Sequence, residues 1–153
     1  IRESYAALLS SAAMDIRLVL AATLGAYLAG SIPFGLIVAR LTGGADPRSV
    51  GSGRTGGTNA LRALGRRRAA VVATADVLKG TLPVLAVRSL AGSIGESAGT
   101  WWEVVAALFA VIGSTRSIWD GFMGGRGIAT GFGTALAIAP AALRRRRAVS
   151  SSC

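Results

Sequence analysis

The sequence predicts an all-α integral membrane protein, a bundle of about four membrane-spanning helices with glycine-rich loops on the cytoplasmic side. Three observations predict this class. Hydrophobic residues make up 52% of the 153 residues and charged residues only 16%, whereas soluble domains carry about a quarter charged residues. The charges gather between long apolar runs, as they do in membrane proteins. The net charge of +10 comes mainly from arginines in those clusters.

Residues 18–39 form the first expected span, because they contain no charge and are long enough to cross the hydrocarbon core. Small side chains recur along this segment at helical spacing, which lets a second helix approach closely. Pro33 lies within Gly30-Ser-Ile-Pro-Phe-Gly35 and is expected to kink the helix near its end. The kink can be a packing feature or a functional bend, and the sequence leaves both open.

The polar segment 40–68 carries seven arginines and a single acidic residue, which predicts a cytoplasmic location and places the N-terminus outside. Residues 69–90 form the second expected span, although they include Asp76 and Lys79. These two residues are three positions apart and share one helix face. We favour an internal ion pair between them; the alternative is that Lys79 faces a polar cavity that holds substrate.

Residues 91–103 are expected to form a short outer loop, with Trp101 and Trp102 at the membrane interface. The third expected span runs from 104 to about 118 and returns to the cytoplasmic side. The alternative for the two tryptophans, that they are simply packed aromatics, stays open.

The fourth expected span, residues 128–143, is short and contains Pro140. Four arginines follow it at 144–147. If this run crosses the membrane, those arginines fall outside, against the usual charge asymmetry of membrane proteins. The run therefore either does not span, or the tail is foreign to the fold.

Two kinds of residue are nearly missing. The chain has no histidine, and its one cysteine is Cys153. Histidine-dependent base catalysis, imidazole metal sites and an internal disulfide are therefore excluded, and no metal or cofactor is expected. A basic chain can also bind nucleic acid, but here the basic residues lie beside uncharged spans, which argues against a nucleic-acid partner.

The first glycine-rich loop reads Gly51-Ser-Gly-Arg-Thr-Gly-Gly-Thr-Asn-Ala-Leu-Arg-Ala-Leu-Gly65. Flexible backbone followed by a helix N-terminus is a common way to bind an anion. Thr58 or Asn59 is expected to cap a helix over 60–64 that ends at Gly65, with Arg62 in its first turn. The candidate binding residues of this loop are Gly51, Gly53, Gly56, Gly57, Thr58 and Asn59, together with Ser52.

The second glycine-rich loop, Gly121–Gly133, offers the backbone amides of Gly124, Gly125 and Gly127 and the guanidinium of Arg126. Arginine binds phosphate through two parallel hydrogen bonds. Either loop alone can be no more than a turn. Both lie on the same predicted membrane face and can meet there, so together they predict a site for phosphate groups that acts by positioning and charge stabilisation.

Four segments resemble the bacterial acyl-phosphate-dependent glycerol-3-phosphate acyltransferases of the PlsY type, over about residues 14–143. They are Gly30-Ser-Ile-Pro-Phe-Gly35, the loop Gly51–Gly65, Asp76-x-x-Lys79-Gly80 and Gly124-Gly-Arg-Gly-Ile-Ala-Thr130. The resemblance implies a multi-pass protein of the bacterial inner membrane. It further implies transfer of a fatty acyl group from acyl phosphate to glycerol 3-phosphate, which gives lysophosphatidic acid for phospholipid synthesis without a metal or cofactor.

The resemblance also implies roles for particular residues. Ser52 and Arg62 fall on the family's important serine and arginine, and Arg126 falls on its glycine-loop lysine. These three are the candidate catalytic residues, and Lys79 joins the candidate substrate-binding residues. The chain departs from the family at Arg54, where the family has asparagine, and at Ser114, where it has histidine.

Family members continue to a C-terminal motif resembling Arg-His-x-x-Asn-Ile-x-Arg, which this chain lacks. We therefore expect a non-native leader at 1–13, a partial acyltransferase domain at 14–143, an aberrant basic tail at 144–153, and impaired activity. The alternative function is a non-catalytic membrane protein that binds anionic metabolites or lipid headgroups, for which glycine loops and arginines are equally suited.

Overall fold

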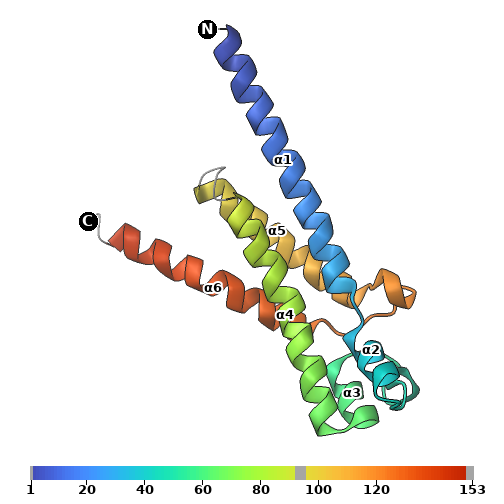
Figure 1. Cartoon of the computed structure of the whole chain (residues 1–153). Coiled ribbons are helices and arrows are strands. Elements are labelled where there is room, and N and C mark those ends of the chain that lie inside the picture. Colours follow the sequence, from blue (N-terminus) through green and yellow to red (C-terminus); the bar gives the residue numbers. More distant parts are fainter. Residues whose placement is uncertain (1, 92–95, 151–153) are drawn as a thin grey trace.

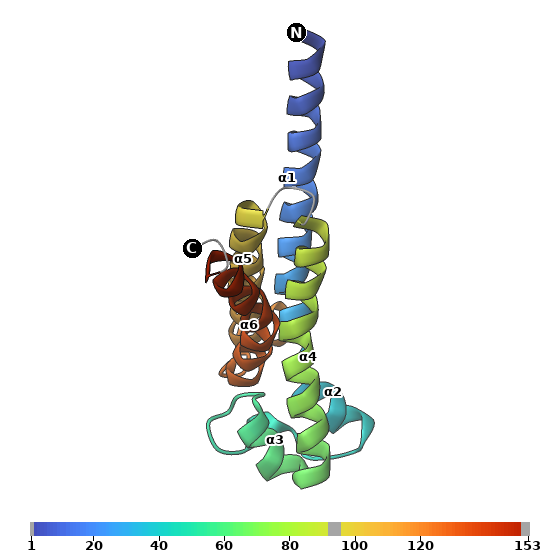
Figure 2. The same ribbon diagram turned by 90° about the vertical axis from the view of Figure 1, so that its left-hand side faces the viewer.

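The computed structural model describes the backbone of residues 2–91 and 96–150 and the side chains of 16–90 and 101–140. Every regular element in these ranges is helical, which confirms the predicted all-α class (Figure 1). The elements are α1 (Arg2–Ser31), α2 (Phe34–Leu41), η1 (Pro47–Ser49), α3 (Gly57–Leu64), α4 (Arg66–Ala91), α5 (Glu96–Thr115), η2 (Ile118–Asp120) and α6 (Ile128–Ser150). The long helices α1, α4, α5 and α6 form the bundle, and α2 and α3 lie at one end of it (Figures 1 and 2).

The first expected span is broken into two helices. By length and apolar composition, 16–31 and 34–41 qualify as a membrane span only as a pair, and the two parts meet at an angle of 46°. Proline explains the break, because Pro33 has no N–H to continue the hydrogen-bond ladder of α1. Its carbonyl instead accepts from the N–H groups of Leu36 and Ile37 and begins α2.

The second expected span is one helix, α4, and Arg66–Leu90 is long and apolar enough to cross a membrane by itself. It begins earlier than predicted, because Gly65 adopts a φ of +79° and turns the chain directly from α3 into α4. The apolar part of α6, Ile128–Pro140, is shorter than a full span. The count of four spans therefore stays a prediction.

The predicted outer loop over 91–103 is wrong from residue 96 onward, since α5 begins at Glu96 and includes both tryptophans. Tertiary contacts explain the extra helix. Trp102 packs against a buried cluster that contains Ala26 and Val87. Glu103 accepts two hydrogen bonds from the guanidinium of Arg88, at 2.9 and 2.7 Å.

Two further boundaries differ from the sequence prediction. Helix α5 ends at Thr115, so the third expected span is shorter at that end and η2 follows it. Helix α6 does not stop at residue 143 but continues to Ser150. Arginine is a good helix former, so the four arginines at 144–147 extend the helix instead of ending it.

Glycines let the long helices approach closely in two places. A Cβ on Gly30 of α1 would overlap the carbonyl oxygen of Ala110 in α5, and one on Gly113 of α5 would overlap that of Tyr27 in α1. Helices α4 and α6 repeat this arrangement. A Cβ on Gly80 would overlap the carbonyl oxygen of Thr130, and one on Gly133 would overlap that of Val77. Backbone-to-backbone contacts of this kind are typical of membrane helix packing.

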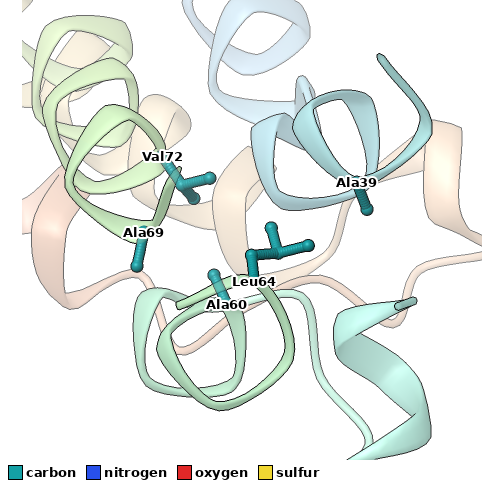
Figure 3. Close-up of a cluster of buried hydrophobic side chains, with 5 residues drawn as sticks. All are labelled: Ala39, Ala60, Leu64, Ala69 and Val72. Carbon is teal, nitrogen blue, oxygen red and sulfur yellow. The ribbon is translucent and has the colours of Figure 1, made fainter. Parts of the chain in front are cut away.

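A compact apolar cluster holds α3 against the end of the bundle. Figure 3 shows its five side chains, which come from α2, α3 and α4 and are Ala39, Ala60, Leu64, Ala69 and Val72. All five are buried, and four of them are alanine or valine. Small side chains bring the three helix backbones close together, and this packing fixes the loop that precedes α3.

Candidate functional site

A cavity of about 490 Å³ lies where the two glycine-rich loops meet the start of α2, the middle of α4 and the start of α6. Ten of the predicted site residues line it: Ser52, Gly56, Gly57, Thr58, Asn59, Arg62, Lys79, Gly125, Arg126 and Gly127. The other three, Gly51, Gly53 and Gly124, are not among its lining residues. The structure therefore brings together residues that lie up to 75 positions apart, counting from Ser52 to Gly127.

The two loops touch through glycines, as the sequence predicts. A Cβ on Gly125 would lie 3.2 Å from the Cα atom of Gly56. Gly124 is also packed tightly, since its Cβ would overlap the carbonyl oxygen of Ser114. Gly124 thus packs the second loop against the end of α5 and does not line the cavity. Arg126, two positions later, is exposed and lines the cavity.

The predicted cap of α3 is wrong. Gly56 occupies the N-cap position, and no side chain caps the helix. The carbonyl of Gly56 accepts from the N–H groups of Asn59 and Ala60, both at 3.0 Å, so the helix begins at Gly57 and not at Ala60. The side chain of the buried Asn59 turns back into the loop instead. It donates to Ser52 Oγ at 3.2 Å and to the carbonyl oxygen of Arg54 at 2.9 Å.

The predicted position of Arg62 is also wrong in part. Because α3 starts earlier, Arg62 lies in its last turn and not in its first. A cation in the last turn of a helix is stabilised by the negative pole of the helix dipole. Arg62 nevertheless lines the cavity, and its Nη1 lies 3.5 Å from Asn59 Oδ1. A Cβ on Gly51 would displace both of these groups, so Gly51 supports the loop without lining the cavity.

Asp76 and Lys79 form the ion pair that the sequence favours, with Lys79 Nζ 2.7 Å from Asp76 Oδ1. Lys79 Nζ also donates to the carbonyl oxygen of Ile32 at 3.0 Å, just before the break at Pro33. Both residues of the pair line the cavity. The two alternatives for Lys79 are therefore compatible: the pair neutralises itself and still forms part of the cavity wall. The Ile32 carbonyl lies at the break in the first span and accepts from the N–H of Phe34 at 3.1 Å as well as from Lys79.

Sequence reasoning missed several residues that line the cavity: Arg54, Thr55, Asp76, Ser114 and Thr130. Ser114 and Thr130 are buried and linked, since Thr130 Oγ1 donates to Ser114 Oγ at 3.0 Å. The sequence does contain an indication of Ser114, because this serine stands where the family that the chain resembles has a histidine. Arg54 likewise stands where that family has an asparagine, and it adds a positive charge to the site.

The cavity is positively charged. Arg54, Arg62 and Arg126 line it, and none of the three has a carboxylate partner within the described part of the chain. Asp76, the acidic residue of the lining, is paired with Lys79. Three unpaired guanidinium groups and the free backbone of two glycine loops suit a ligand that carries phosphate.

Arg48 of η1 links the segments that precede the two glycine-rich loops, outside the cavity. Its guanidinium donates to Asp46 and, at 2.8 Å through Nη1, to the buried Asp120 of η2. The hydrogen bonds from the Arg48 side chain and then from its backbone N–H hold the pKa of Asp46 below its usual value of 3.8. The hydrogen bond to Asp120 thus joins η1 to η2 across 72 positions of the sequence.

The fold and the site define a helical protein of the membrane type with a positively charged cleft between two glycine-rich loops. The sequence model of the glycerol-3-phosphate acyltransferase family matches residues 20–145. The chain therefore belongs to the glycerol-3-phosphate acyltransferase family.

Individual relatives agree with this assignment. The chain is 50% identical over 125 residues to a glycerol-3-phosphate acyltransferase of Synechococcus sp. (strain JA-2-3B'a(2-13)), which covers 81% of this chain and 59% of that protein. It is 42% identical over 114 residues to one of Anaeromyxobacter dehalogenans (strain 2CP-1), covering 74% and 56% of the two chains. The chain thus spans a little under three fifths of the length of these relatives.

Solved structures show the same fold. The glycerol 3-phosphate form of PlsY, an integral membrane glycerol 3-phosphate acyltransferase, superposes with a TM-score of 0.69 at 38% identity, over 82% of this chain and 60% of that one. The lysophosphatidic acid form gives a TM-score of 0.67 at 36% identity, with the same coverage.

Proposed function

We propose that this chain serves acyl transfer from an acyl phosphate to glycerol 3-phosphate, with lysophosphatidic acid and inorganic phosphate as products. One observation carries the proposal: Ser52, Arg62 and Arg126, which are distant in sequence, line a single positively charged cavity. The family membership and the glycerol 3-phosphate and lysophosphatidic acid forms of the solved PlsY structures support it.

Each substrate carries a phosphate, and the cavity offers two sets of groups for them. In the proposed arrangement, the first loop and Arg62 bind one phosphate, and Arg126 with the amides around Gly125 and Gly127 binds the other. Ser52 Oγ already accepts a hydrogen bond from Asn59. Its own hydrogen is then available to donate to a substrate oxygen. Lys79, Thr58 and the remaining glycines complete the binding surface.

The reaction forms one bond and breaks one. The 1-hydroxyl oxygen of glycerol 3-phosphate attacks the carbonyl carbon of the acyl phosphate, and the bond from that carbon to the bridging phosphate oxygen breaks. The hydroxyl proton passes to a phosphate oxygen, so no side chain of the protein has to accept it. The acyl phosphate is already activated, and the contribution of the chain is to position both substrates and to stabilise negative charge.

We further propose that 14–143 is the acyltransferase part of the chain, located in the bacterial inner membrane with the N-terminus outside and both glycine loops cytoplasmic. The seven arginines between 40 and 68 support this orientation. Single cysteines placed at Ser52 and Arg126, with Cys153 replaced, should both react with a membrane-impermeant thiol reagent from the cytoplasmic side. Labelling of the two positions from opposite sides of the bilayer would overturn the shared site.

The function is tested on the full chain in detergent by two measurements, binding of glycerol 3-phosphate and conversion of the radiolabelled compound to lysophosphatidic acid by palmitoyl phosphate. Ser52→Ala should keep binding and lower turnover on the order of 10²-fold, as loss of one stabilising donor does in other enzymes. Ser89→Ala is the matched control, because Ser89 is exposed on α4 and does not line the cavity.

Three outcomes separate the alternatives. Turnover that is lost in Ser52→Ala while binding persists supports an enzyme. Binding without turnover in both forms supports a non-catalytic protein that binds anionic metabolites or headgroups. Absence of glycerol 3-phosphate binding in the unaltered chain contradicts both. The absolute rate of the unaltered chain tests the sequence-based prediction of impaired activity.

A further inference from the structure

A second cavity, of about 320 Å³, adjoins the first on the other side of the first glycine loop. Ser52 and Arg54 line both cavities, so this stretch of the loop is a wall between them. The opposite wall comes from the end of α5 and the loop after η2. The residues that line only the second cavity are Gly53, Thr115, Arg116, Phe122 and Met123.

The charge of the second cavity is entirely positive. Its lining contains Arg54 and Arg116 and no acidic residue. Neither guanidinium forms an ion pair in the part of the chain that the structure describes. The carboxylates of Asp46 and Asp120 both pair with Arg48 and do not line this cavity. Two unpaired guanidinium groups facing one cavity would repel each other, and a bound anion relieves that repulsion.

The backbone of one wall is held in an uncommon conformation. Phe122 has a φ of +63°, the only positive φ of a non-glycine residue among those described, whereas the φ of +67° at Gly53 is one that glycine adopts easily. A positive φ is unfavourable for a side chain such as phenylalanine and persists where the surroundings enforce it. Here the N–H of Phe122 donates to the carbonyl oxygen of Ser117 at 2.8 Å, which closes the loop and holds the wall in place.

We propose that this second cavity is an additional phosphate-binding site, which takes inorganic phosphate or the phosphate group of a small monoester beside the acyl-transfer cavity. Arg54 and Arg116 bind the anion, and Ser52 connects the two cavities. A volume of about 320 Å³ is at the lower end of the range for small-ligand sites and admits a phosphate monoester of a few carbons. The proposal does not depend on acyl transfer, since it concerns binding alone.

The two cavities share Arg54 in their lining. An anion in either cavity lies within reach of Arg54, so two anions compete for the same guanidinium group. A phosphate should therefore bind more weakly in the second cavity when the first cavity is occupied. Its binding should also weaken as ionic strength rises, because both arginines are exposed to solvent.

The experiment counts the phosphates bound by the full chain in uncharged detergent, by equilibrium dialysis with radiolabelled inorganic phosphate. The unaltered chain should bind three, two in the first cavity and one in the second. Arg116→Gln should weaken the phosphate of the second cavity by about tenfold or more and leave the two of the first cavity, because it removes a charge-assisted pair of hydrogen bonds. Arg116→Lys should recover part of the loss. Arg67→Gln, which removes an exposed arginine that lines neither cavity, should still bind three.

Arg62→Gln should instead remove one phosphate of the first cavity and keep the phosphate of the second, because Arg62 lines only the first cavity. The proposal is overturned if the unaltered chain binds no more than two phosphates, or if Arg116→Gln changes neither the number bound nor the affinity. An unaltered chain that binds phosphate only at the Arg116-dependent position would instead count against the proposed function. Unchanged thermal unfolding of Arg116→Gln verifies its fold.

Competition identifies the source of the ligand. The phosphate of the second cavity can be displaced by glycerol 3-phosphate added to the solution or by phosphatidic acid built into nanodiscs of phosphatidylcholine. Displacement by the soluble compound alone assigns the cavity to a metabolite, and displacement by the lipid alone assigns it to a headgroup. Displacement by neither, with the phosphate of the second cavity bound, assigns that cavity to inorganic phosphate, the proposed product.

Discussion

Helices α4 and α6 are in contact through Gly133, and replacing this glycine by alanine tests how strongly that contact holds the bundle. The new Cβ would overlap the carbonyl oxygen of Val77 and lie 2.9 Å from its carbonyl carbon and 3.0 Å from Thr81 Oγ1. Favourable contacts need about 3.5–4.0 Å, so the overlap with the Val77 oxygen is relieved only if α6 moves away by about 1 Å or more. The movement also strains the hydrogen bond from Thr81 Oγ1 to the Gly133 carbonyl, which is 2.9 Å long.

Overpacking of this kind costs about 1–3 kcal/mol. Gly131 provides a matched control two positions earlier on the same helix. A Cβ there would meet Val111 Cγ2 at 3.9 Å, an ordinary contact. Gly131→Ala should therefore stabilise the protein by about 0.5–1 kcal/mol through helix propensity. The two alanine variants should differ by about 1.5–4 kcal/mol in the free energy of unfolding.

The assay is unfolding of the full chain in mixed micelles by increasing sodium dodecyl sulfate, followed by tryptophan fluorescence. Gly133→Ala should also weaken phosphate binding, because Val77 and the first residues of α6 line the main cavity. Equal unfolding free energies for the two variants would show that α4 and α6 do not pack through Gly133, and would refute the reasoning.

Three further predictions concern the loops. Arg48→Ala leaves the buried carboxylate of Asp120 unpaired and should lower the free energy of unfolding by about 1–3 kcal/mol. Adding Asp120→Asn should recover part of that loss in the same unfolding assay. If the losses of the two single variants simply add in the double variant, the two side chains do not interact. The folded pKa of Asp46 lies below 3.8, so its pair with Arg48 stabilises the protein above the unfolded pKa, and this contribution is lost as pH falls through the folded pKa. Asp46→Asn should therefore make the free energy of unfolding slightly less dependent on pH below about 4. An unchanged dependence on pH would contradict this. Arg126→Ala should weaken glycerol 3-phosphate binding by about tenfold in calorimetric titration, while Arg126→Lys keeps most of the affinity. If both variants lose the same affinity, the positive charge of Arg126 does not account for its contribution to binding.

Much of the fold is a local property of the chain and could be read from it. Uncharged apolar runs predict long helices, and Pro33 breaks the first of them because proline lacks an N–H wherever it stands. Gly65 ends α3 as expected, with the positive φ that glycine adopts easily. The pairing of Asp76 with Lys79 also follows from spacing, since residues three apart on a helix are neighbours.

Errors arose where partners distant in sequence decide the outcome. The N-terminal part of α5 was taken for a loop, and it is helical because Trp102 packs against α1 and α4 and Glu103 pairs with Arg88. The sequence predicts Thr58 or Asn59 as the cap of α3, yet both lie inside the helix, and the Asn59 side chain donates to Ser52 in the preceding loop. In both cases the local pattern was compatible with either structure, and tertiary contacts selected one of them.

The sequence by itself determined that this chain is all-helical, belongs with membrane proteins and carries two glycine loops suited to phosphate, because composition, turn residues and motifs act locally. Only the tertiary structure decided which groups share a cavity. It placed Arg62 in the last turn of its helix, left Gly51 and Gly124 out of the cavity lining, and brought Arg54 and Arg116 to one cavity. The physical reason is that these placements depend on which helices and loops pack together, and a periodic pattern of small residues predicts a close contact without naming its partner.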